Sequence, residues 1–470
     1  ESMEGLVKEQ AEELTHKSMH DDLTGLPNRF LLLDRLKQAM KLSARNDNFA
    51  AVLSVSLSNY PRVFSGAGSE AAEDMLRQAS ERLERVGRGV DTIGVALNEQ
   101  ALTLSRIAYN ELAMLVVDIS SIDSIPKIIS RVTESLEQPF VLAGQQHQNS
   151  VHCGIAVYPN DGLDADLLIR NATLARSYAE RRSQKASGNA YFSKSIDELS
   201  IKNAKMATAL RTAIEEDALQ IVYQPKVNAK ENRVSGVEAL ARWHHPELGH
   251  VGPMEFVNVA EQIGVIDKLT DWVLSRVCRD IRAGGLNDLR VSVNISPIEL
   301  CDENRGRRLL EIVQQSGVSP SQIELEIVES SVLENFELSR GILAPLQEAG
   351  MLVALDDFGT AYSSLNLLLE IPVDIIKIDR SFVSDIHLAK ENQAVVQAIV
   401  HMAGSMGKRI VAEGVENQQE LDCLLALGCV EIQGYFYSKP ISYRDLVAYV
   451  RQLGVMSSAS GEAALRLKAG

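Results

Sequence analysis

The chain has 470 residues, 45% of them hydrophobic and 23% charged, which is sufficient for two globular domains with cores of their own. Its formal net charge of -16 argues against a surface for duplex nucleic acid or for an anionic membrane, because such surfaces depend on clustered Lys and Arg. Five cysteines without a CxxC pair indicate a reducing compartment, and no apolar run reaches the roughly 20 residues that cross a bilayer, so we expect a cytoplasmic location.

Residues 1–19 are expected to form an amphipathic helix. Its apolar residues recur at helical spacing between charged ones: Met3, Leu6, Val7, Ala11 and Leu14. Two interpretations stay open, a helix packed on its own domain and a signalling helix that couples the chain to an upstream sensor. Because the chain begins with Glu1 rather than Met, we expect a fragment of a longer protein, and the cytoplasmic part of a membrane-anchored sensor is one such case.

Residues 20–195 alternate between strand-like and helix-like segments. Apolar runs rich in β-branched residues predict strands at residues 50–58, 112–119 and 150–159. Helical periodicity predicts helices at residues 70–86 and 163–182. This alternation predicts an α/β layer domain.

Three motifs in this half resemble the GGDEF domain, the diguanylate cyclase fold. They are HDDLTGLPNR at residues 20–29, RIAYNELAML at residues 106–115 and GIAVYPNDG at residues 154–162. The resemblance implies a nucleotide-cyclase-like α/β fold. It also locates the signature loop at residues 108–112, where the family has two glycines, an acid pair and Phe, and this chain has Ala108, Tyr109, Asn110, Glu111 and Leu112.

The residues that cyclase chemistry needs are replaced in this domain. Tyr109 would fill the space that a glycine pair leaves for a nucleotide. Ser56 or Ser58 stands where the resemblance places a metal-binding aspartate, and a serine hydroxyl is a poor ligand for Mg²⁺. Phe64 takes the place of a guanine-reading Asn, and Glu180 that of a Lys. We therefore expect a degenerate, inactive GGDEF domain that acts in regulation or dimerisation and can still offer a site to GTP or to a protein partner.

Residues 196–453 contain eight short apolar runs with strand-like composition, most of them separated by helical patterns. The predicted strands are residues 219–225, 236–243, 290–296, 322–329, 351–357, 373–379, 409–414 and 430–436. Eight strands with intervening helices predict a (β/α)₈ barrel of the TIM type. Residues 454–470 are expected to be a loosely structured tail.

Each predicted strand ends near a polar or charged residue. These residues are Gln224, Glu238, Asn294, Glu326, Asp356 with Asp357, Lys377 with Asp379, Glu413, and Gln433. Active sites of such barrels gather at the carboxyl ends of the strands, so we expect these side chains to meet at one mouth.

So many carboxylates in one mouth repel one another unless protons or cations neutralise them. Carboxylates together with one amide, without a His or Cys cluster, favour Mg²⁺ or Mn²⁺ over Zn²⁺. The adjacent pair Asp356 and Asp357 can bridge two ions, which is an arrangement that activates water against a phosphodiester.

Two cations in this half favour an anionic substrate. The period of two along a strand puts Glu238, Leu240 and Arg242 on one face, where Arg242 can bind a phosphate oxygen. Lys377 lies among isoleucines, and we expect its ammonium to face the acidic mouth and to position water or phosphate.

Simpler interpretations exist for single motifs. The segment DDFGTAYSSL at residues 356–365 is also typical of a helix cap, and Glu329 is equally a surface or capping acid. His244 and His245 are expected to be hydrogen-bonding loop residues, because a turn follows them. The prediction of a site therefore depends on the complete set.

The same residues resemble the EAL domain, the cyclic di-GMP phosphodiesterase family. The motifs YQPKV, EALARW, VNIS, ELEIVES, DDFGTAYSSL, IKIDRSFV, AEGVE and QGYFYSKP occur in the order of that family. The resemblance implies a barrel with one antiparallel strand and hydrolysis of cyclic di-GMP to linear pGpG with two divalent metals. Ala361 and Val328 depart from the family pattern, but neither replaces a metal ligand.

The resemblance also assigns roles residue by residue. The implied metal ligands are Glu238, Asn294, Glu326, Asp356, Asp357 and Glu413. The implied catalytic residues are Glu413, Lys377 and Glu238, with Lys377 steadying the water that Glu413 helps to activate. The implied substrate-binding or supporting residues are Gln224, Leu240, Arg242, Asp379 and Gln433, and Glu329 would hold the loop after Asp357.

We therefore expect a phosphodiesterase regulated by an inactive first domain. The alternative is a receptor that binds cyclic di-GMP without cutting it, for which the loss of a ligand such as Glu238 would be typical. The ligand set is complete, which favours the enzyme. A homodimer through the EAL domain and the N-terminal helix is expected from the resemblance.

Overall fold

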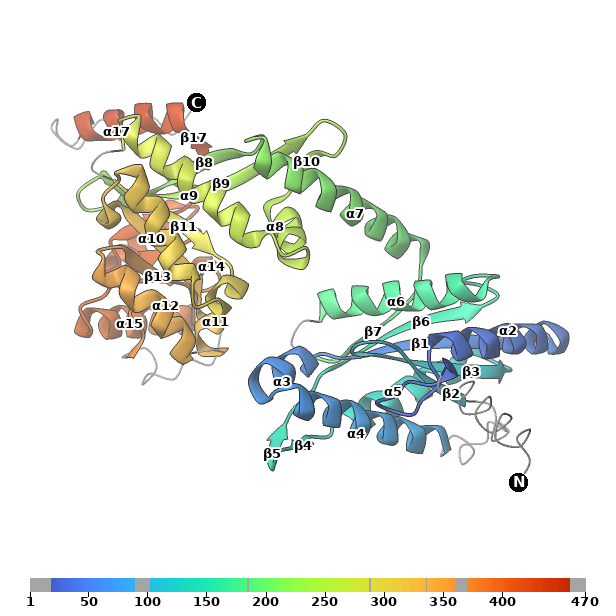
Figure 1. The fold of residues 1–470 in the computed structure, drawn as a ribbon. Coiled ribbons are helices and arrows are strands. Elements are labelled where there is room, and N and C mark those ends of the chain that lie inside the picture. The colour runs from blue at the N-terminus through green and yellow to red at the C-terminus, as the bar shows by residue number, and fades with distance from the viewer. Residues whose placement is uncertain are drawn as a thin grey trace, which may run out of the picture. The chain divides into compact units, whose positions relative to one another are not determined.

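The computed structural model describes residues 18–88, 102–183, 186–286, 289–334, 336–359 and 370–456. The helix predicted over residues 1–19 lies almost entirely outside these ranges, as do Ala361 and most of the predicted tail. The chain divides into two compact units between Asn203 and Ala204, inside helix α7 (Lys194–Glu215) (Figure 1).

The first unit is built on a five-stranded sheet with the strand order β2-β3-β1-β6-β7. Neighbouring strands are antiparallel, apart from β6 and β7, which are parallel. The strands are β1 (Phe49–Leu57), β2 (Leu102–Ala108), β3 (Glu111–Ile119), β6 (Val151–Tyr158) and β7 (Gly188–Tyr191), and a separate hairpin consists of β4 (Phe140–Leu142) and β5 (Gln145–His147).

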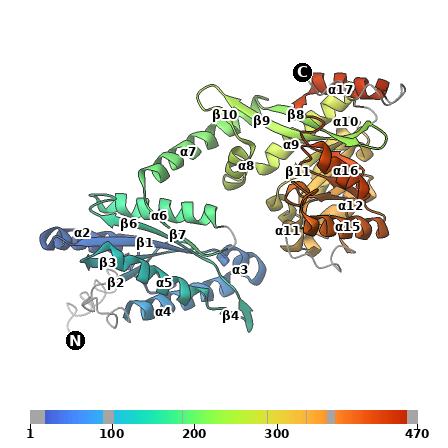
Figure 2. The ribbon, with the colours of Figure 1, turned by 180° about the vertical axis from the view of Figure 1, so that it is seen from behind.

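Helices cover both faces of this sheet (Figure 2). Helices α2 and α6 pack on one face, and α3, α4 and α5 pack on the other. Their bounds are α2 (Arg29–Asn46), α3 (Tyr60–Ala67), α4 (Ser69–Arg88), α5 (Ile125–Glu137) and α6 (Ala165–Arg182). Side-chain caps start two of them, because Asn28 accepts hydrogen bonds at the start of α2 and Asp164 at the start of α6. The prediction of an α/β layer domain is confirmed.

The second unit contains a closed ring of eight strands in the order β9-β11-β12-β13-β14-β15-β16-β8, in which β8 pairs back with β9. Strand β8 is antiparallel to both neighbours, whereas the other pairs in the ring are parallel. The strands are β8 (Gln220–Asn228), β9 (Arg233–His245), β11 (Arg290–Ile295), β12 (Ile323–Val328), β13 (Leu352–Phe358), β14 (Ile375–Ile378), β15 (Arg409–Ala412) and β16 (Glu431–Gln433). The predicted eight-stranded barrel with one antiparallel strand is confirmed.

Helices surround the barrel and bury their apolar faces against it, in one continuous core that includes Trp243, Phe256 and Leu274. Two short strands, β10 (Gly249–Val251) and β17 (Ile441–Ser442), extend the sheet beyond the ring. The helices are α8 (Pro253–Gln262), α9 (Ile266–Arg282), α10 (Arg305–Ser316), α11 (Glu329–Glu334), α12 (Phe336–Glu348), α14 (Arg380–Val383), α15 (Lys390–Ser405), α16 (Gln418–Ala426) and α17 (Tyr443–Met456).

The direction of β8 corrects one detail of the strand-end argument. Because β8 is antiparallel to β9 and β16, its carboxyl end points away from the mouth at which its neighbours end. Gln224 therefore reaches the mouth as a mid-strand residue opposite Glu238, and not as a residue at a strand end. Lys226, two residues further along β8, lies deeper in the barrel and is 2% exposed.

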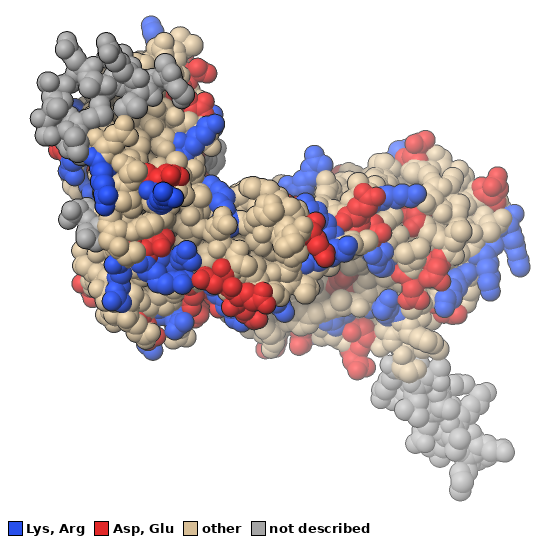
Figure 3. Space-filling model, turned by 90° about the horizontal axis from the view of Figure 1, so that it is seen from above, with Lys and Arg blue, Asp and Glu red and all other residues tan. Residues whose placement is uncertain are grey.

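The surface carries charges of both signs. On the face shown in Figure 3, Lys and Arg side chains lie interspersed with Asp and Glu side chains. Among the helices of the described ranges, none is both long enough and apolar enough to cross a membrane.

Candidate active site

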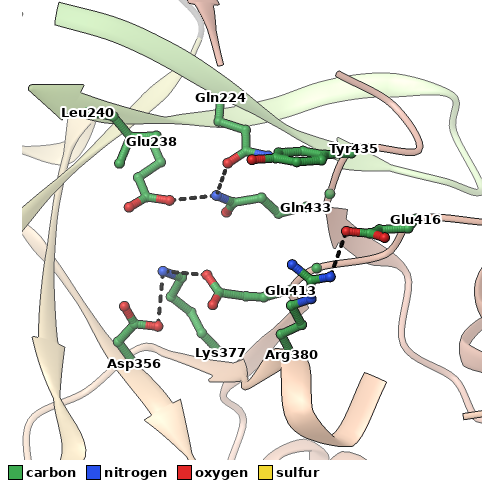
Figure 4. Close-up of a pocket in the computed structure, with 12 residues that line it drawn as sticks. Gln224, Glu238, Leu240, Asp356, Lys377, Arg380, Glu413, Glu416, Gln433 and Tyr435 are labelled. Carbon is green, nitrogen blue, oxygen red and sulfur yellow. Dashed lines mark hydrogen bonds and ion pairs between the residues drawn. The ribbon is translucent and has the colours of Figure 1, made fainter. Parts of the chain in front are cut away.

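Side chains from several barrel strands line a cavity of about 240 Å³ (Figure 4). The strands end in polar groups here because their apolar residues face the core and the carboxyl ends open to solvent. The predicted residues that line it are Gln224, Glu238, Leu240, Asp356, Lys377, Glu413 and Gln433.

Lys377 lies at the centre of the acidic groups. Its Nζ is 2.6 Å from Glu413 Oε1, 3.1 Å from Asp356 Oδ1 and 2.6 Å from Glu326 Oε2. The side chain is almost fully buried, and Figure 4 shows its ammonium between Asp356 and Glu413. Lys377 therefore faces the carboxylates, as the sequence predicted.

Three carboxylates converge beside this lysine. Oxygen atoms of Asp356, Asp357 and Glu413 all lie within 4.8 Å of one another. Successive residues of a regular strand point to opposite faces, but Asp357 has a φ of 56°, and the pairing with β14 is irregular between Leu355 and Phe358. This local irregularity allows the two adjacent aspartates of β13 to contribute to one cluster.

Glu238 forms the opposite side of the cavity. Asn294 Nδ2 donates a hydrogen bond of 2.8 Å to Glu238 Oε1, and Gln433 Nε2 donates one of 2.5 Å to Glu238 Oε2. Gln433 Nε2 is also 3.3 Å from Gln224 Oε1. Two amides thus orient the Glu238 carboxylate, and Figure 4 shows the contact from Gln433.

Glu326 lies beneath the cavity rather than on its lining. Lys226 Nζ is 2.7 Å from its Oε1, and Lys377 Nζ is 2.6 Å from its Oε2. Both carboxylate oxygens therefore have an ammonium partner. A sequence pattern that places Glu326 at a strand end does not reveal this depth.

Three further predicted residues do not line the cavity and lie in different settings. Arg242 is partly buried outside the lining, with Nη1 donating to Ala241 O at 2.8 Å. Asp379 accepts a hydrogen bond from Ser381 N at 3.0 Å and caps α14. Glu329 is 2% exposed and accepts a hydrogen bond from Gly359 N at 3.0 Å, so the interpretation of a surface acid is wrong.

The loop interpretation of the histidines holds for His245. Its Nδ1 accepts hydrogen bonds of 3.2 Å from the backbone N–H groups of Glu247 and Leu248. The ring therefore stabilises the turn between β9 and β10.

The electrostatics of the cluster favour a bound cation. Burial, together with the charges of Asp356, Glu238 and Glu326, raises the pKa of Glu413 to about 8. Burial also raises the pKa of Asp356 and Asp357. Burial acts in the same direction on Glu326, but Lys226 and Lys377 outweigh it and lower its pKa to about 2. The ionised carboxylates are unfavourable when they are buried together, and a cation would stabilise them. Their hard oxygen atoms fit a divalent cation of the Mg²⁺ or Mn²⁺ type.

Five residues that line the cavity were not among the predicted site residues: Arg380, Gly414, Glu416, Gly434 and Tyr435. Arg380 and Glu416 form an ion pair of 2.7 Å across the rim (Figure 4). Four of the five follow a predicted site residue by one or two positions, which is the signal that sequence reasoning could have used.

Comparison with known proteins identifies both halves of the chain. A family model described as diguanylate cyclase, GGDEF domain, matches residues 18–186, and a model described as EAL domain matches residues 207–440. The chain belongs to the GGDEF–EAL family. Both resemblances noted in the sequence are confirmed.

Three relatives of this GGDEF–EAL chain show how far the similarity extends. It is 32% identical to the bifunctional diguanylate cyclase/cyclic di-GMP phosphodiesterase MucR of Pseudomonas aeruginosa, across 93% of this chain and 62% of that protein. It is 33% identical to the cyclic di-GMP phosphodiesterase NbdA of the same species, across 93% and 54%. It is 31% identical to the protein Mb1389c of Mycobacterium bovis, across 91% and 67%. The chain thus spans between about half and two thirds of these relatives.

Proposed function

We propose that the EAL domain hydrolyses cyclic di-GMP to linear pGpG with two divalent cations, Mg²⁺ or Mn²⁺. The observation that carries the proposal is the convergence of Asp356, Asp357 and Glu413 beside the buried ammonium of Lys377. The relatives MucR and NbdA support it, because both carry cyclic di-GMP phosphodiesterase in their names.

The metal ligands in this proposal are Glu238, Asn294, Glu326, Asp356, Asp357 and Glu413. The bound cations supply Lewis-acid chemistry and a water of lowered pKa. Lys377 holds the carboxylates of Asp356 and Glu413 in place through its Nζ. Glu413 accepts a proton from the attacking water as the general base.

Substrate binding falls to residues around this cluster: Gln224, Leu240, Arg242, Asp379 and Gln433. Leu240 offers the cavity an apolar wall, and the guanidinium of Arg242 binds a phosphate oxygen of the ligand. Gln433 Oε1 is buried without a hydrogen-bond partner in the described part of the chain, so it is free to accept one from a ligand. Glu329 supports the loop that follows Asp357.

The GGDEF domain, in the same proposal, is catalytically inactive and regulates the EAL domain. The centroid of the Tyr109 ring lies 5.0 Å from that of Tyr60 and 5.8 Å from that of Phe64. Aromatic side chains therefore pack at the signature loop. Ser58 Oγ bonds His152 Nδ1 at 2.7 Å, and Ser56 is buried.

The remaining acid of the signature loop is also engaged. Glu111 Oε1 accepts hydrogen bonds from Ser54 Oγ at 2.5 Å and from Thr173 Oγ1 at 2.8 Å. The proposal has two further parts. GTP or a protein partner regulates the chain through this domain, and the chain forms a homodimer through the EAL domain and the N-terminal helix.

The direct test is hydrolysis by the purified chain. With cyclic di-GMP and Mg²⁺ or Mn²⁺, we expect the linear dinucleotide to appear and a chelator to stop its formation. Glu238→Gln should abolish turnover, whereas Glu231→Gln, which changes an exposed acid on the turn between β8 and β9, should not. No linear product at high enzyme concentration would refute the proposal, and tight binding without product would identify a receptor instead.

A second assay tests the first domain. The Glu238→Gln variant is incubated with GTP and Mg²⁺, so that any cyclic di-GMP formed is not consumed. We expect none to accumulate. Its accumulation would show that the GGDEF domain is an active cyclase.

A further inference from the structure

A second buried lysine lies beneath the candidate active site. Lys226 Nζ donates to Ser292 Oγ at 2.5 Å, to Glu324 Oε1 at 2.6 Å and to Glu326 Oε1 at 2.7 Å. An ammonium has three N–H donors, so these contacts satisfy it completely. Lys226 therefore has one fixed orientation.

The partners of Lys226 lie on two neighbouring strands. Ser292 pairs with Glu324 and Asn294 with Glu326 in the register of β11 and β12. Because side chains alternate along a strand, residues two apart share a face, so Ser292 and Glu324 form a layer below Asn294 and Glu326. Lys226 joins the lower layer to Glu326 in the upper one.

Glu326 is held from two sides. Lys226 binds its Oε1 from below, and Lys377 binds its Oε2. Lys377 in turn binds Asp356 and Glu413 at the cavity. A continuous chain of charge-assisted contacts thus runs from the lower layer to the carboxylate cluster, and such contacts are short and directional.

We propose that Lys226 is a positioning residue: by binding Oε1 of Glu326 it sets the orientation of that carboxylate, and through Lys377 the placement of Asp356 and Glu413 for divalent cations. The inference rests on the proposed function. Lys226 does not line the cavity, and its hydrogen bond to a proposed metal ligand is the one to Glu326 Oε1.

The alternative is that Lys226 has a structural role and only neutralises the buried carboxylates. In the barrel interior the carboxylates of Glu324 and Glu326 face the ammonium groups of Lys226 and Lys377. Removing Lys226 alone leaves one carboxylate without a counter-charge, which is costly in a buried site. The double variant Lys226→Met with Glu324→Gln removes one charge of each sign and keeps the balance, but it does not restore the contact to Glu326.

The experiment compares this double variant with Glu324→Gln alone, which keeps Lys226 on Glu326. Lys408→Met is the matched lysine control, because Lys408 Nζ binds the Val373 carbonyl at the amino ends of β14 and β15. Three quantities are measured on the full chain: the melting temperature, the affinity of the substrate-free protein for Mn²⁺ by calorimetry, and kcat and KM for cyclic di-GMP.

We expect the double variant to melt near the wild type and to lose about 10- to 100-fold in Mn²⁺ affinity and in kcat, the usual effect of removing a partner that orients a metal ligand. KM should change much less, and Lys408→Met should behave like the wild type. Glu324→Gln takes one counter-charge from the buried ammonium of Lys226, so it should melt below the wild type, but it should keep most of its Mn²⁺ affinity and kcat because Lys226 still binds Glu326. Unchanged Mn²⁺ affinity and kcat in a folded double variant would overturn the proposal. Failure of both Lys226→Met and the double variant to fold would make Lys226 a folding residue and would also overturn it.

The metal measurement separates the two proposals. If the wild type binds Mn²⁺ but produces no linear dinucleotide, the proposed function fails, while the affinities still test the role of Lys226. If the wild type is active and the double variant binds Mn²⁺ equally well, only the inference about Lys226 fails.

Discussion

Lys377 and Glu326 form an ion pair of 2.6 Å in the barrel interior, where both side chains are almost completely shielded from solvent. The lysine comes from β14 and the glutamate from β12, with β13 between them. An ion pair at this depth is costly to break, because either partner left alone is an uncompensated buried charge. The same ammonium also binds two carboxylates at the cavity, so this pair links the barrel core to the candidate metal site.

Replacement of this lysine should affect stability and activity together. Lys377→Met leaves Glu326, Asp356 and Glu413 without their shared partner, so we expect a loss of about 3 to 5 kcal/mol in the free energy of unfolding of the metal-free protein. Mn²⁺ should restore part of this loss, because it neutralises the same carboxylates. Denaturant unfolding with and without Mn²⁺ measures both effects, and a variant as stable as the wild type without metal would contradict the argument.

Removal of the Glu329 carboxylate should weaken the loop after Asp357. Glu329→Ala leaves the partly buried Gly359 N–H without this acceptor, a change that costs about 1 kcal/mol. We expect turnover of cyclic di-GMP to fall as well, since Gly359 lies two residues from Asp357. Glu303→Ala, at an exposed acid, is the control. Equal turnover in the two variants would show that the contact does not support the site.

Gly434 leaves no space for a side chain. A Cβ at this position would lie 2.1 Å from the Val415 carbonyl oxygen and 2.4 Å from Val415 N, and these backbone atoms cannot rotate away. Gly434→Ala should therefore cost about 1 to 3 kcal/mol or more, as overpacking does, and should distort the cavity lining that Gly434 contributes. Melting temperature and turnover should both fall.

The control for this substitution is another glycine of the same barrel. Gly404 is an exposed residue of α15, and a Cβ there would meet no atom within 4 Å. Gly404→Ala should raise stability by up to about 1 kcal/mol, because alanine favours a helix over glycine. A destabilising effect at Gly404 as large as at Gly434 would contradict the steric explanation.

Asp21 should contribute to the stability of the first domain in a pH-dependent way. Arg106 Nη1 lies 2.9 Å from Asp21 Oδ2, and Thr24 donates through N and Oγ1 to Asp21 Oδ1. Burial acts to raise the pKa of Asp21, but the hydrogen bonds from Thr24 and Arg106 outweigh it, and the pKa is lowered from 3.8. The folded state therefore favours the ionised form of Asp21. The ionised carboxylate stabilises the fold above about pH 4, and this stabilisation is lost as the pH falls further.

Melting curves of the full chain at decreasing pH check this sign. Asp21→Asn should melt below the wild type near neutral pH, and the difference should shrink as the pH falls below about 4. Asp22→Asn, which changes the exposed neighbouring acid, is the control and should follow the wild type. A difference for Asp21→Asn that grows on acidification would refute the assignment.

The sequence by itself determined the elements of both domains and most of the residues of the candidate site. Each of the eight predicted strands overlaps one barrel strand, because the apolar runs that predict a buried strand are a local property of the chain. Glu238, Asp356, Lys377 and Glu413 were found for a related reason, since a charged residue within or next to an apolar run is costly to bury unless it faces a functional cavity.

Only the tertiary structure decided how these residues meet. The reversal of β8 places Gln224 opposite Glu238 and sends Lys226 inward to Glu326, a contact that no spacing in the sequence indicates. Glu326 proved to lie beneath the cavity, although it shares the strand-end pattern of residues that do line it. Arg242 proved to lie outside the lining, although the period of two places it on one strand face with Glu238 and Leu240. The physical reason is that strand direction and register depend on hydrogen bonds between segments far apart in the chain, and these set the depth and the partner of every side chain in the barrel.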